Sequence, residues 1–524
     1  MSGGVRPKAW RWCEGAKRNR RELKQGETRL VGVITSRCNA RGYALAGCDE
    51  QLVGATAQQS MQMDQGRLPS ARDAREVWRR NCNQQGRTKW RLCRVTEAFT
   101  VRKWYSLIDK VYRLDNLHQA YRSVRSNKGA PGIDGETVEE FGEHLDERLH
   151  QIHLELKTNT YQPSPVRRVE IDKDDGSKRP LGIPTVKDRV VQEALRRVIE
   201  PIFEPDFHPS SYAYRPGRSC QAAVAKAELF INRYGLKHVV DMDLSKCFDR
   251  LDHELILNGV SRRISDGRIL DLIRKFLKAG VMRDGSWEET EIGSPQGGVI
   301  SPLLCNIYLD MFDQKMKALG IRIVRYADDI LIFARNPRQA ERYRDIAVKI
   351  LEEDLKLTVN RQKTHITDVY RGVAFLGFVI YSKHVSIHPK RIKRFKDRVR
   401  QLTPRNHGMS VEQQIEQLNR FLRGWINYFR VANCKRFLQQ MMGWIRRRLR
   451  MKQMREWKTW KALHRALRRN GYQGDFDKIS MRRWRNSASP LLSMALPNTW
   501  FDQMGLVDLT RYRVGTLHVY RYRR

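Results

Sequence analysis

The stretch Ile321-Arg322-Ile323-Val324-Arg325-Tyr326-Ala327-Asp328-Asp329-Ile330-Leu331-Ile332-Phe333 places two adjacent carboxylates between two apolar runs. Runs rich in β-branched and aromatic residues on either side of a short break predict a β-hairpin. Its tight turn presents Asp328 and Asp329 together at one exposed tip. Two neighbouring like charges repel unless something positive lies beside them, and Mg²⁺ prefers such oxygen ligands. The hairpin therefore predicts a metal site, although a solvated acidic turn has the same pattern.

A third carboxylate accompanies this hairpin. The segment His238-Val239-Val240-Asp241-Met242-Asp243-Leu244 alternates as a strand, which places Asp241 and Asp243 on one face. A strand with one acid beside a hairpin with two is the palm arrangement of template-directed polymerases. There, one metal ion lowers the pKa of the primer 3′-hydroxyl and a second neutralises charge on the triphosphate. We therefore expect Asp243, Asp328 and Asp329 to hold two Mg²⁺ ions; a helix cap or surface pair is the alternative for Asp243.

The charge of the chain indicates a polyanionic partner. The 524 residues include 99 Lys and Arg against 58 Asp and Glu, a formal net charge of +41. From residue 381 onward there are 34 Lys and Arg against 8 Asp and Glu, so 26 of these positive charges lie in the last 144 residues. No apolar run reaches the length of a membrane span, so nucleic acid is favoured over a membrane.

Cysteine usage and length bound the remaining possibilities. Nine cysteines are scattered without a CxxC pair, which argues against a zinc ribbon and for a reducing compartment. We expect a bacterial cytoplasmic, nucleoid-associated protein. The predicted regions are a basic, poorly ordered extension (1–95), a catalytic region (96–380), a helical region (381–470) and a basic segment with possible DNA binding (471–524).

Several motifs accompany the three acids in a fixed order. They are Lys178-Arg179-Pro180-Leu181-Gly182-Ile183-Pro184, Asp243-Leu244-Ser245-Lys246-Cys247-Phe248-Asp249, Pro295-Gln296-Gly297-Gly298-Val299-Ile300-Ser301-Pro302-Leu303-Leu304, Tyr326-Ala327-Asp328-Asp329 and Phe375-Leu376-Gly377-Phe378. The series resembles the reverse transcriptases encoded by group II introns and covers roughly residues 107–460. The resemblance implies an α+β right-hand polymerase, with fingers and palm on an antiparallel sheet and an α-helical thumb, or maturase domain. It also implies an RNA-dependent DNA polymerase that copies intron RNA and assists splicing and retrohoming.

The resemblance assigns nucleotide-binding roles to five residues. Phe248 looks like the aromatic steric gate that rejects a ribose 2′-hydroxyl, with a plain core phenylalanine as the alternative. Gln296 is similar to the glutamine that contacts the incoming nucleotide. Lys178 and Arg179 are placed to bind the triphosphate, because cationic side chains suit phosphate oxygens. Lys363 is a candidate proton donor to pyrophosphate, although a solvated lysine is an equal alternative.

Two loops resemble segments that hold the template and the primer. Asn127, Lys128 and Gly129 open a Gly- and Pro-containing loop that looks like the amino-terminal extension motif of the family, although a plain connector has the same composition. Phe375 and Gly377 belong to a segment similar to the primer grip, where a glycine lets the primer backbone approach closely.

The basic carboxy-terminal half resembles the maturase domain. In Phe421-Leu422-Arg423-Gly424-Trp425-Ile426-Asn427-Tyr428-Phe429-Arg430 the aromatic residues form a helical core stripe, and Arg423 and Arg430 fall away from it. Arg446, Arg447 and Arg448 begin a densely basic stretch. Where acids are so few, such a run favours binding to an RNA backbone.

The implied partners are intron RNA, an RNA template with a DNA primer, target DNA and dNTPs; the oligomeric state is not specified by the sequence. Many family members carry a nuclease domain with His-Asn-His motifs and paired cysteines, which the sequence given does not show. We therefore expect the form lacking that domain, with priming from nascent strands. The alternatives are a domesticated relative used in defence or repair, and an RNA-binding splicing factor without polymerase activity.

Overall fold

The computed structural model describes residues 103–172, 178–283, 286–288, 293, 297–405, 408–474 and 479–520. The prediction made for residues 1–95 lies outside this part of the chain, as does Gln296. Among the described residues, no helix combines the length and apolar character needed to cross a membrane.

The centre of the palm is a four-stranded antiparallel sheet with the order β6-β7-β3-β8. Its strands are β3 (His238–Asp243), β6 (Arg322–Tyr326), β7 (Asp329–Ala334) and β8 (His365–Asp368). Because successive side chains of a strand point to opposite faces, Val240 and Met242 enter one hydrophobic core while Val239 enters another. The predicted hairpin, alternating strand and antiparallel sheet are thus confirmed.

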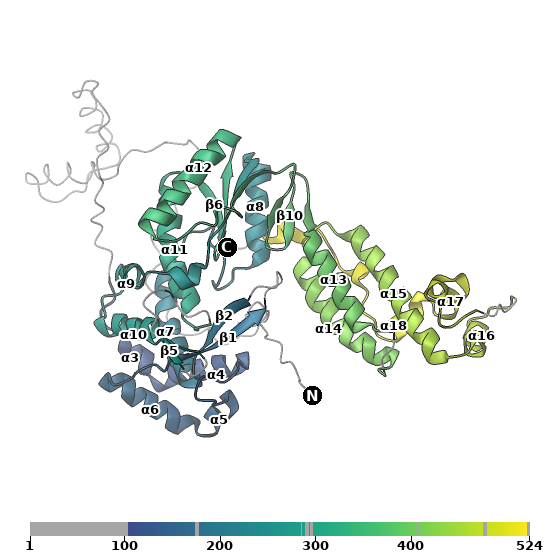
Figure 1. The fold of residues 1–524 in the computed structure, drawn as a ribbon, viewed down its shortest axis with the longest axis horizontal. Helices are drawn as coiled ribbons and strands as arrows, with labels where there is room; N and C mark the ends of the chain where they lie inside the picture. Colours follow the sequence, from purple (N-terminus) through teal and green to yellow (C-terminus); the bar gives the residue numbers. More distant parts are fainter. Residues whose placement is uncertain are drawn as a thin grey trace, which may run out of the picture. The chain divides into compact units, whose positions relative to one another are not determined.

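Helices cover both faces of this sheet. Residues of α9, α11 and α12 join the core that contains Val240, and residues of α8 join the core that contains Val239. Figure 1 shows α8, α11 and α12 around the strands. The elements of this region are α7 (Val186–Phe203), α8 (Cys220–Tyr234), η4 (Cys247–Arg250), α9 (His253–Ser261), α10 (Gly267–Lys278), α11 (Ser301–Ala318), α12 (Pro337–Lys349) and the π-helical turn η5 (Ile350–Asp354).

The fingers region combines short helices with a second sheet of order β2-β1-β4-β5. In this sheet β1 pairs with β2 in antiparallel and with β4 in parallel orientation. Its elements are α3 (Ile108–Tyr112), α4 (Leu114–Asn127), α5 (Val138–Glu143), α6 (Leu145–Thr158), β1 (Val166–Asp172), β2 (Lys178–Ile183), β4 (Val281–Arg283) and β5 (Ser286–Glu288).

A small three-stranded sheet leads into a helical region. The sheet has the order β11-β10-β9, and helices α13, α14 and α15 run side by side after it (Figure 1). The elements are β9 (Val373–Phe375), β10 (Phe378–Ile380), β11 (Val385–Ile387), α13 (Pro389–Leu402), α14 (Val411–Phe429), α15 (Lys435–Trp457), α16 (Trp460–Arg469), η6 (Trp484–Ala488), α17 (Pro490–Ala495), α18 (Asn498–Gln503), η7 (Leu509–Arg511) and η8 (Thr516–Tyr520). The α+β class with a helical carboxy-terminal region is therefore confirmed.

The segment after residue 471 packs on the helical region through two apolar clusters. Phe501, Leu506 and Leu517 belong to the same core as the α14 and α15 side chains. Leu492 and Leu496 pack with residues of α15 and α16 in a smaller cluster. The segment that the sequence marked only as basic and possibly DNA-binding therefore also has a packing role.

Candidate active site

The acidic hairpin turns on two residues. Tyr326 pairs with Asp329, which leaves Ala327 and Asp328 as the loop. Ala327 has φ 58°, and a positive φ at the first loop residue is typical of the tight turns that match the twist of paired strands. Asp328 alone stands in the turn, whereas Asp329 is the first residue of β7. The expectation that both acids share the tip is corrected accordingly.

Strand register brings Asp243 directly opposite Asp329. The two residues are paired across β3 and β7, and Asp241 lies two positions back on the same face, opposite Leu331. Residues two apart on a strand share a face. The third carboxylate predicted from the sequence therefore lies beside the hairpin.

Crowding of these carboxylates changes their acidity. Although Asp329 keeps contact with solvent, partial enclosure by the protein and the neighbouring Asp328, Asp241 and Asp243 raise its pKa to about 7. Burial likewise raises the pKa of Asp241 to about 6, and nearby Asp243 adds to the effect. Both shifts arise first from burial of the carboxylate and then from the neighbouring negative charge.

Two side chains from the segment before β8 contact Asp243. The Lys363 ammonium Nζ lies 3.3 Å from Asp243 Oδ2, and Asn360 Nδ2 donates a hydrogen bond to the same oxygen at 3.2 Å. Sequence reasoning placed Lys363 near the chemistry and missed Asn360. Among the described residues, no three His, Cys, Asp or Glu side chains already stand in coordinating positions. The acids are nevertheless of the type that hard divalent cations bind.

A buried ion pair anchors the acidic turn and was missed by sequence reasoning. Arg325 and Asp313 are both fully buried, and Arg325 Nη2 donates to Asp313 Oδ2 at 2.7 Å. Arg325 Nη1 also donates to Asn306 Oδ1 at 3.2 Å and to the carbonyl of Ala327 at 3.3 Å. The guanidinium therefore ties the loop residue before Asp328 to helix α11.

The sequence did contain signals for this pair. Arg325 lies two and four residues after Ile323 and Ile321. Its side chain is therefore expected on the same, inward face of the strand. On α11, Asn306 and Asp313 are seven residues apart, so they lie on one face of that helix. An inward-facing cation opposite a polar stripe on a buried helix indicates a paired charge.

The predicted nucleotide-binding residues fall on several elements. Phe248 lies on η4, is 7% exposed and meets the ring of Tyr214 edge-on, with centroids 6.4 Å apart. Lys178 begins β2, is exposed and pairs with Glu170 at 2.9 Å. The Arg179 side chain and Gln296 lie outside the described part of the structure.

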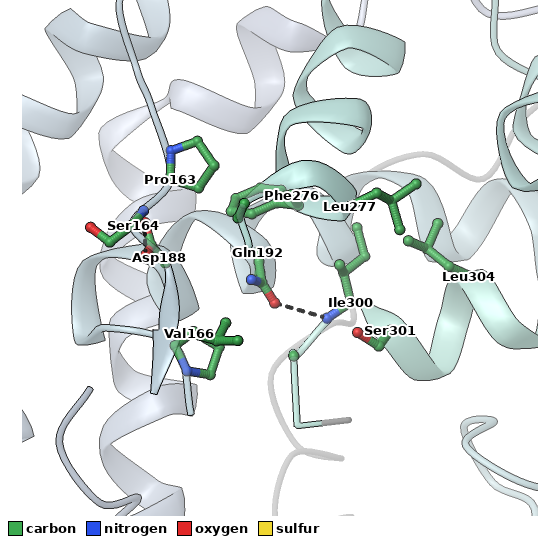
Figure 2. Close-up of a pocket in the computed structure, with 13 residues that line it drawn as sticks. Pro163, Ser164, Val166, Asp188, Gln192, Phe276, Leu277, Ile300, Ser301 and Leu304 are labelled. Carbon is green, nitrogen blue, oxygen red and sulfur yellow. Dashed lines mark hydrogen bonds between the residues drawn. The ribbon is translucent and has the colours of Figure 1, made fainter. Parts of the chain in front are cut away.

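The loop that follows Gln296 is tied to the fingers. Gly297 has φ 129°, and a β-carbon there would lie 2.2 Å from the carbonyl oxygen of Gly182 on β2. Gln192 Oε1 on α7 accepts hydrogen bonds from Val299 N at 2.7 Å and Ile300 N at 3.4 Å. Figure 2 shows the Gln192 side chain pointing at this backbone. The predicted nucleotide-binding motif that contains Gly297 is therefore held against the one that contains Gly182.

The predicted template loop packs on the start of α7. Asn127 ends α4, and Lys128 follows as its left-handed cap with φ 48°. A β-carbon on Gly129 would lie 2.3 Å from Arg189 Nη1, while Arg189 Nη2 donates to the Ala130 carbonyl at 2.8 Å. A side chain at Gly129 would thus have to displace the Arg189 guanidinium.

The predicted primer-contacting segment is a second two-residue hairpin. Phe375 pairs with Phe378, and the loop residues Leu376 and Gly377 have φ 49° and 83°. The Tyr428 hydroxyl on α14 donates to the Leu376 carbonyl at 2.9 Å, and its ring stacks on Phe378. The hairpin is thus held by the helical region.

The basic residues predicted to bind RNA differ in their surroundings. Arg423 is exposed and Arg430 is half-buried. In contrast, the three consecutive arginines make contacts inside the protein: Arg446 with Asp508, Arg447 with Ser487 and the Trp484 ring, and Arg448 with Thr403. These three have packing roles, and their contact with RNA stays a prediction.

Comparison with known proteins agrees with this arrangement. The reverse transcriptase (RNA-dependent DNA polymerase) family matches residues 171–380, and the group II intron maturase-specific domain matches residues 392–471. Protein YkfC of Escherichia coli K12 is 37% identical over 306 residues, covering 51% of this chain and 80% of that protein. The group II intron-encoded protein LtrA of Lactococcus lactis is 35% identical over 280 residues, covering 53% of this chain.

The chain spans 44% of the length of LtrA. Among solved structures, apo telomerase from Candida tropicalis matches 60% of each chain with a TM-score of 0.39 and 14% identity, a likeness too weak for inference. The family match and the similarity to LtrA place the chain in the reverse transcriptase class of RNA-directed DNA polymerases. More particularly, the chain belongs to the family of group II intron reverse transcriptases and maturases.

Proposed function

We propose that this protein extends a DNA primer on group II intron RNA and that Asp243, Asp328 and Asp329 bind the metal ions for this reaction. The observation that carries the proposal is the register of β3 and β7, which sets Asp243 against Asp329 with Asp328 in the adjoining turn. Carboxylates crowded in this way are unfavourable for the fold alone, and the electrostatic cost is offset when cations bind.

Two Mg²⁺ ions at these carboxylates would lower the pKa of the primer hydroxyl and neutralise charge on the triphosphate. The chain's own residues prepare the site. Asn360 and Lys363 both reach Asp243 Oδ2 and fix the orientation of that carboxylate. Lys363 is 68% exposed, so its ammonium can move from Asp243 to the pyrophosphate leaving group.

The remaining nucleotide and primer contacts are proposed from the motifs. Phe248 stands five residues after Asp243 and is proposed to exclude a ribose 2′-hydroxyl. Lys178, Arg179 and Gln296 are proposed to contact the incoming nucleotide. The Leu376–Gly377 turn is proposed to hold the primer backbone, and its link to α14 through Tyr428 supports this role.

The helical region is proposed to bind the intron RNA itself. Its excess of cations favours a phosphate backbone, and a protein that binds only the folded RNA stabilises that fold by mass action. Splicing chemistry then belongs to the RNA. Retrohoming into target DNA, with priming from nascent strands, is part of the same proposal.

A primer-extension assay on an RNA template tests the polymerase assignment. We expect Asp328→Ala to reduce the rate about a thousand-fold, because metal-bound charge stabilisation supplies several kcal/mol of the barrier reduction. Asp345→Ala, which removes an exposed carboxylate on α12, is the matched control and should leave the rate unchanged. Activity that survives Asp328→Ala contradicts the assignment of the acids.

The alternatives predict different outcomes of the same experiments. An RNA-binding splicing factor without polymerase activity would bind intron RNA but would not extend a primer. A domesticated reverse transcriptase would extend primers, but its gene would lie outside any self-splicing intron. Inspection of the flanking DNA for a ribozyme fold separates that case from the proposed one.

A further inference from the structure

Tyr214 combines two unfavourable features that the proposed polymerase mechanism has not used. Its φ is 57°, in the left-handed region, and its side chain is 50% exposed. For a bulky residue a positive φ is a genuine outlier, and such strain persists only where the surroundings impose it. Glycine would adopt this backbone without strain. The aromatic ring at this position therefore calls for an explanation.

The neighbouring backbone is fixed on both sides of Tyr214. Before it, the Ala213 carbonyl accepts a hydrogen bond from buried Asn306 Nδ2 at 2.9 Å, and Tyr212 N donates to the Arg325 carbonyl at 3.0 Å. After it, the buried Arg215 guanidinium donates to the Ser211 carbonyl at 2.9 Å. It also donates to both carboxylate oxygens of Glu204 and to the His208 carbonyl.

This framework is the one that holds the acidic turn. Asn306 uses its amide nitrogen for Ala213 and its oxygen for Arg325 Nη1, and Arg325 in turn donates to the Ala327 carbonyl. Tyr214 is therefore set at a defined place relative to the catalytic hairpin.

The ring of Tyr214 meets Phe248. Their centroids are 6.4 Å apart with an interplanar angle of 80°, which is the favourable edge-to-face geometry of aromatic pairs. Phe248 is almost wholly buried, whereas half of Tyr214 remains accessible. A gate against a 2′-hydroxyl must keep one orientation, because a small rotation of its ring opens space for an extra oxygen.

We propose that Tyr214 is a positioning residue for sugar selection: its ring holds Phe248 in the orientation that excludes ribonucleotides. The proposal rests on the proposed role of Phe248 as the steric gate. It accounts for a half-exposed aromatic side chain on a strained backbone that packs against Phe248.

Single-nucleotide incorporation by the full chain, with dNTP and the matching rNTP, tests this role. We expect Tyr214→Ala to lower the dNTP preference about three- to ten-fold, which is the range expected from the loss of one aromatic pair. Tyr214→Phe keeps the ring and should keep the preference. Tyr214→Gly removes the ring but accepts the positive φ without strain. It should therefore lose the dNTP preference without losing unfolding free energy, which shows that the preference does not fall merely because the protein is less stable.

A double-variant comparison distinguishes action through Phe248 from direct contact with the nucleotide. Phe248→Ala should remove most of the preference, and adding Tyr214→Ala should then change nothing further. Tyr105→Ala, which removes an exposed tyrosine ring near the start of the described chain, serves as the control.

The outcomes separate this proposal from the proposed function. An unchanged preference in Tyr214→Ala, or an equal loss with and without Phe248, overturns the positioning role while leaving the polymerase assignment intact. A wild-type protein that extends no primer overturns both. If Phe248→Ala retains full preference, the gate itself is wrong and the role of Tyr214 falls with it.

Discussion

Two hairpins in this protein turn on two residues each, and they are held in different ways. In the acidic hairpin only Ala327 has a positive φ, and the buried Arg325–Asp313 pair supports the turn through the Ala327 carbonyl. In the second hairpin both Leu376 and Gly377 have positive φ, as a type I′ turn requires.

The second hairpin is held by a hydrogen bond and aromatic packing rather than by a buried ion pair. The Tyr428 hydroxyl binds the Leu376 carbonyl, and Phe378 contacts the rings of Tyr428 and Phe429. The difference teaches that a turn carrying negative charge is fixed by a buried cation, whereas a turn proposed to lie along a primer is fixed by an aromatic surface. The four changes below test this contrast.

The largest effect is expected from breaking the buried ion pair. Asp313→Ala leaves the Arg325 guanidinium buried without its carboxylate, which should cost about 3–5 kcal/mol of unfolding free energy. Urea denaturation measures this loss. The double change Arg325→Met/Asp313→Leu replaces both charges and should recover most of the stability, because paired apolar replacements are often neutral.

Primer extension then shows whether the ion pair, besides stabilising the fold, also positions the acidic turn. The double variant still lacks the donor to the Ala327 carbonyl, so we expect its rate to stay at least about ten-fold below wild type. A double variant with full activity would show that the pair only fills space beneath the sheet.

A smaller loss is expected at the glycine of the second hairpin. Gly377→Ala places a side chain on a residue with φ 83°, and its β-carbon would lie 3.3 Å from Arg391 Nε. Left-handed backbone costs a non-glycine residue about 1–2 kcal/mol. Thermal unfolding should show this loss, while Gly408→Ala on the surface serves as the control. A change below the error of the method would mean that the turn relaxes freely.

The hydroxyl that joins this hairpin to α14 should contribute about 1 kcal/mol. Tyr428→Phe removes that bond and keeps the stacked ring. We expect a few-fold weaker primer binding in filter or anisotropy titrations, with the rate at saturating primer unchanged. A fall in the saturated rate with unchanged primer binding would place the hydroxyl in the chemistry rather than in primer holding.

The smallest effect concerns Asp310, which lies near the ion pair on α11. Burial, reinforced by Asp313, raises its pKa to about 6 from an ordinary value of 3.8. Because the folded state holds this proton more tightly, the stabilising contribution is present at low pH and is lost as the pH rises from about 4 through 6.

Asp310→Asn should therefore flatten this part of the stability profile and raise stability at pH 7.5 by less than about 1 kcal/mol, once solvent screening is allowed for. Urea midpoints measured between pH 4 and 8 provide the test. A steeper decline in the variant than in wild type would contradict the raised pKa.

The sequence was sufficient for elements whose pattern is local. The strand at 238–243 follows from its alternation, and the hairpin at 322–334 follows from two apolar runs on either side of a short break. The antiparallel register that sets Asp243 opposite Asp329 is specified by neither segment alone. The Phe421–Phe429 stripe also proved to be helical core, because Trp425 and Phe429 are buried.

Features that depend on long-range partners were beyond such reasoning. Asn360 reaches Asp243 from a segment more than a hundred positions away, and no local pattern specifies that contact. The run of arginines beginning at Arg446 predicts an RNA-binding surface because acidic residues are so few around it. Its carboxylate, aromatic and carbonyl partners come from residues between 403 and 508, so pairing of each arginine was invisible locally.

The packing of η8 on α8 has a consequence for synthesis of the chain. Leu517 shares a core with Ala223, Val224 and Phe230, although roughly 290 residues separate them. At elongation rates of about 5–20 residues per second, that interval is on the order of 15 to 60 s. During this time the face of α8 that later packs against η8 remains uncovered in the nascent chain. The palm therefore completes its packing late in folding. A chaperone that shields this apolar face would protect the nascent chain until then.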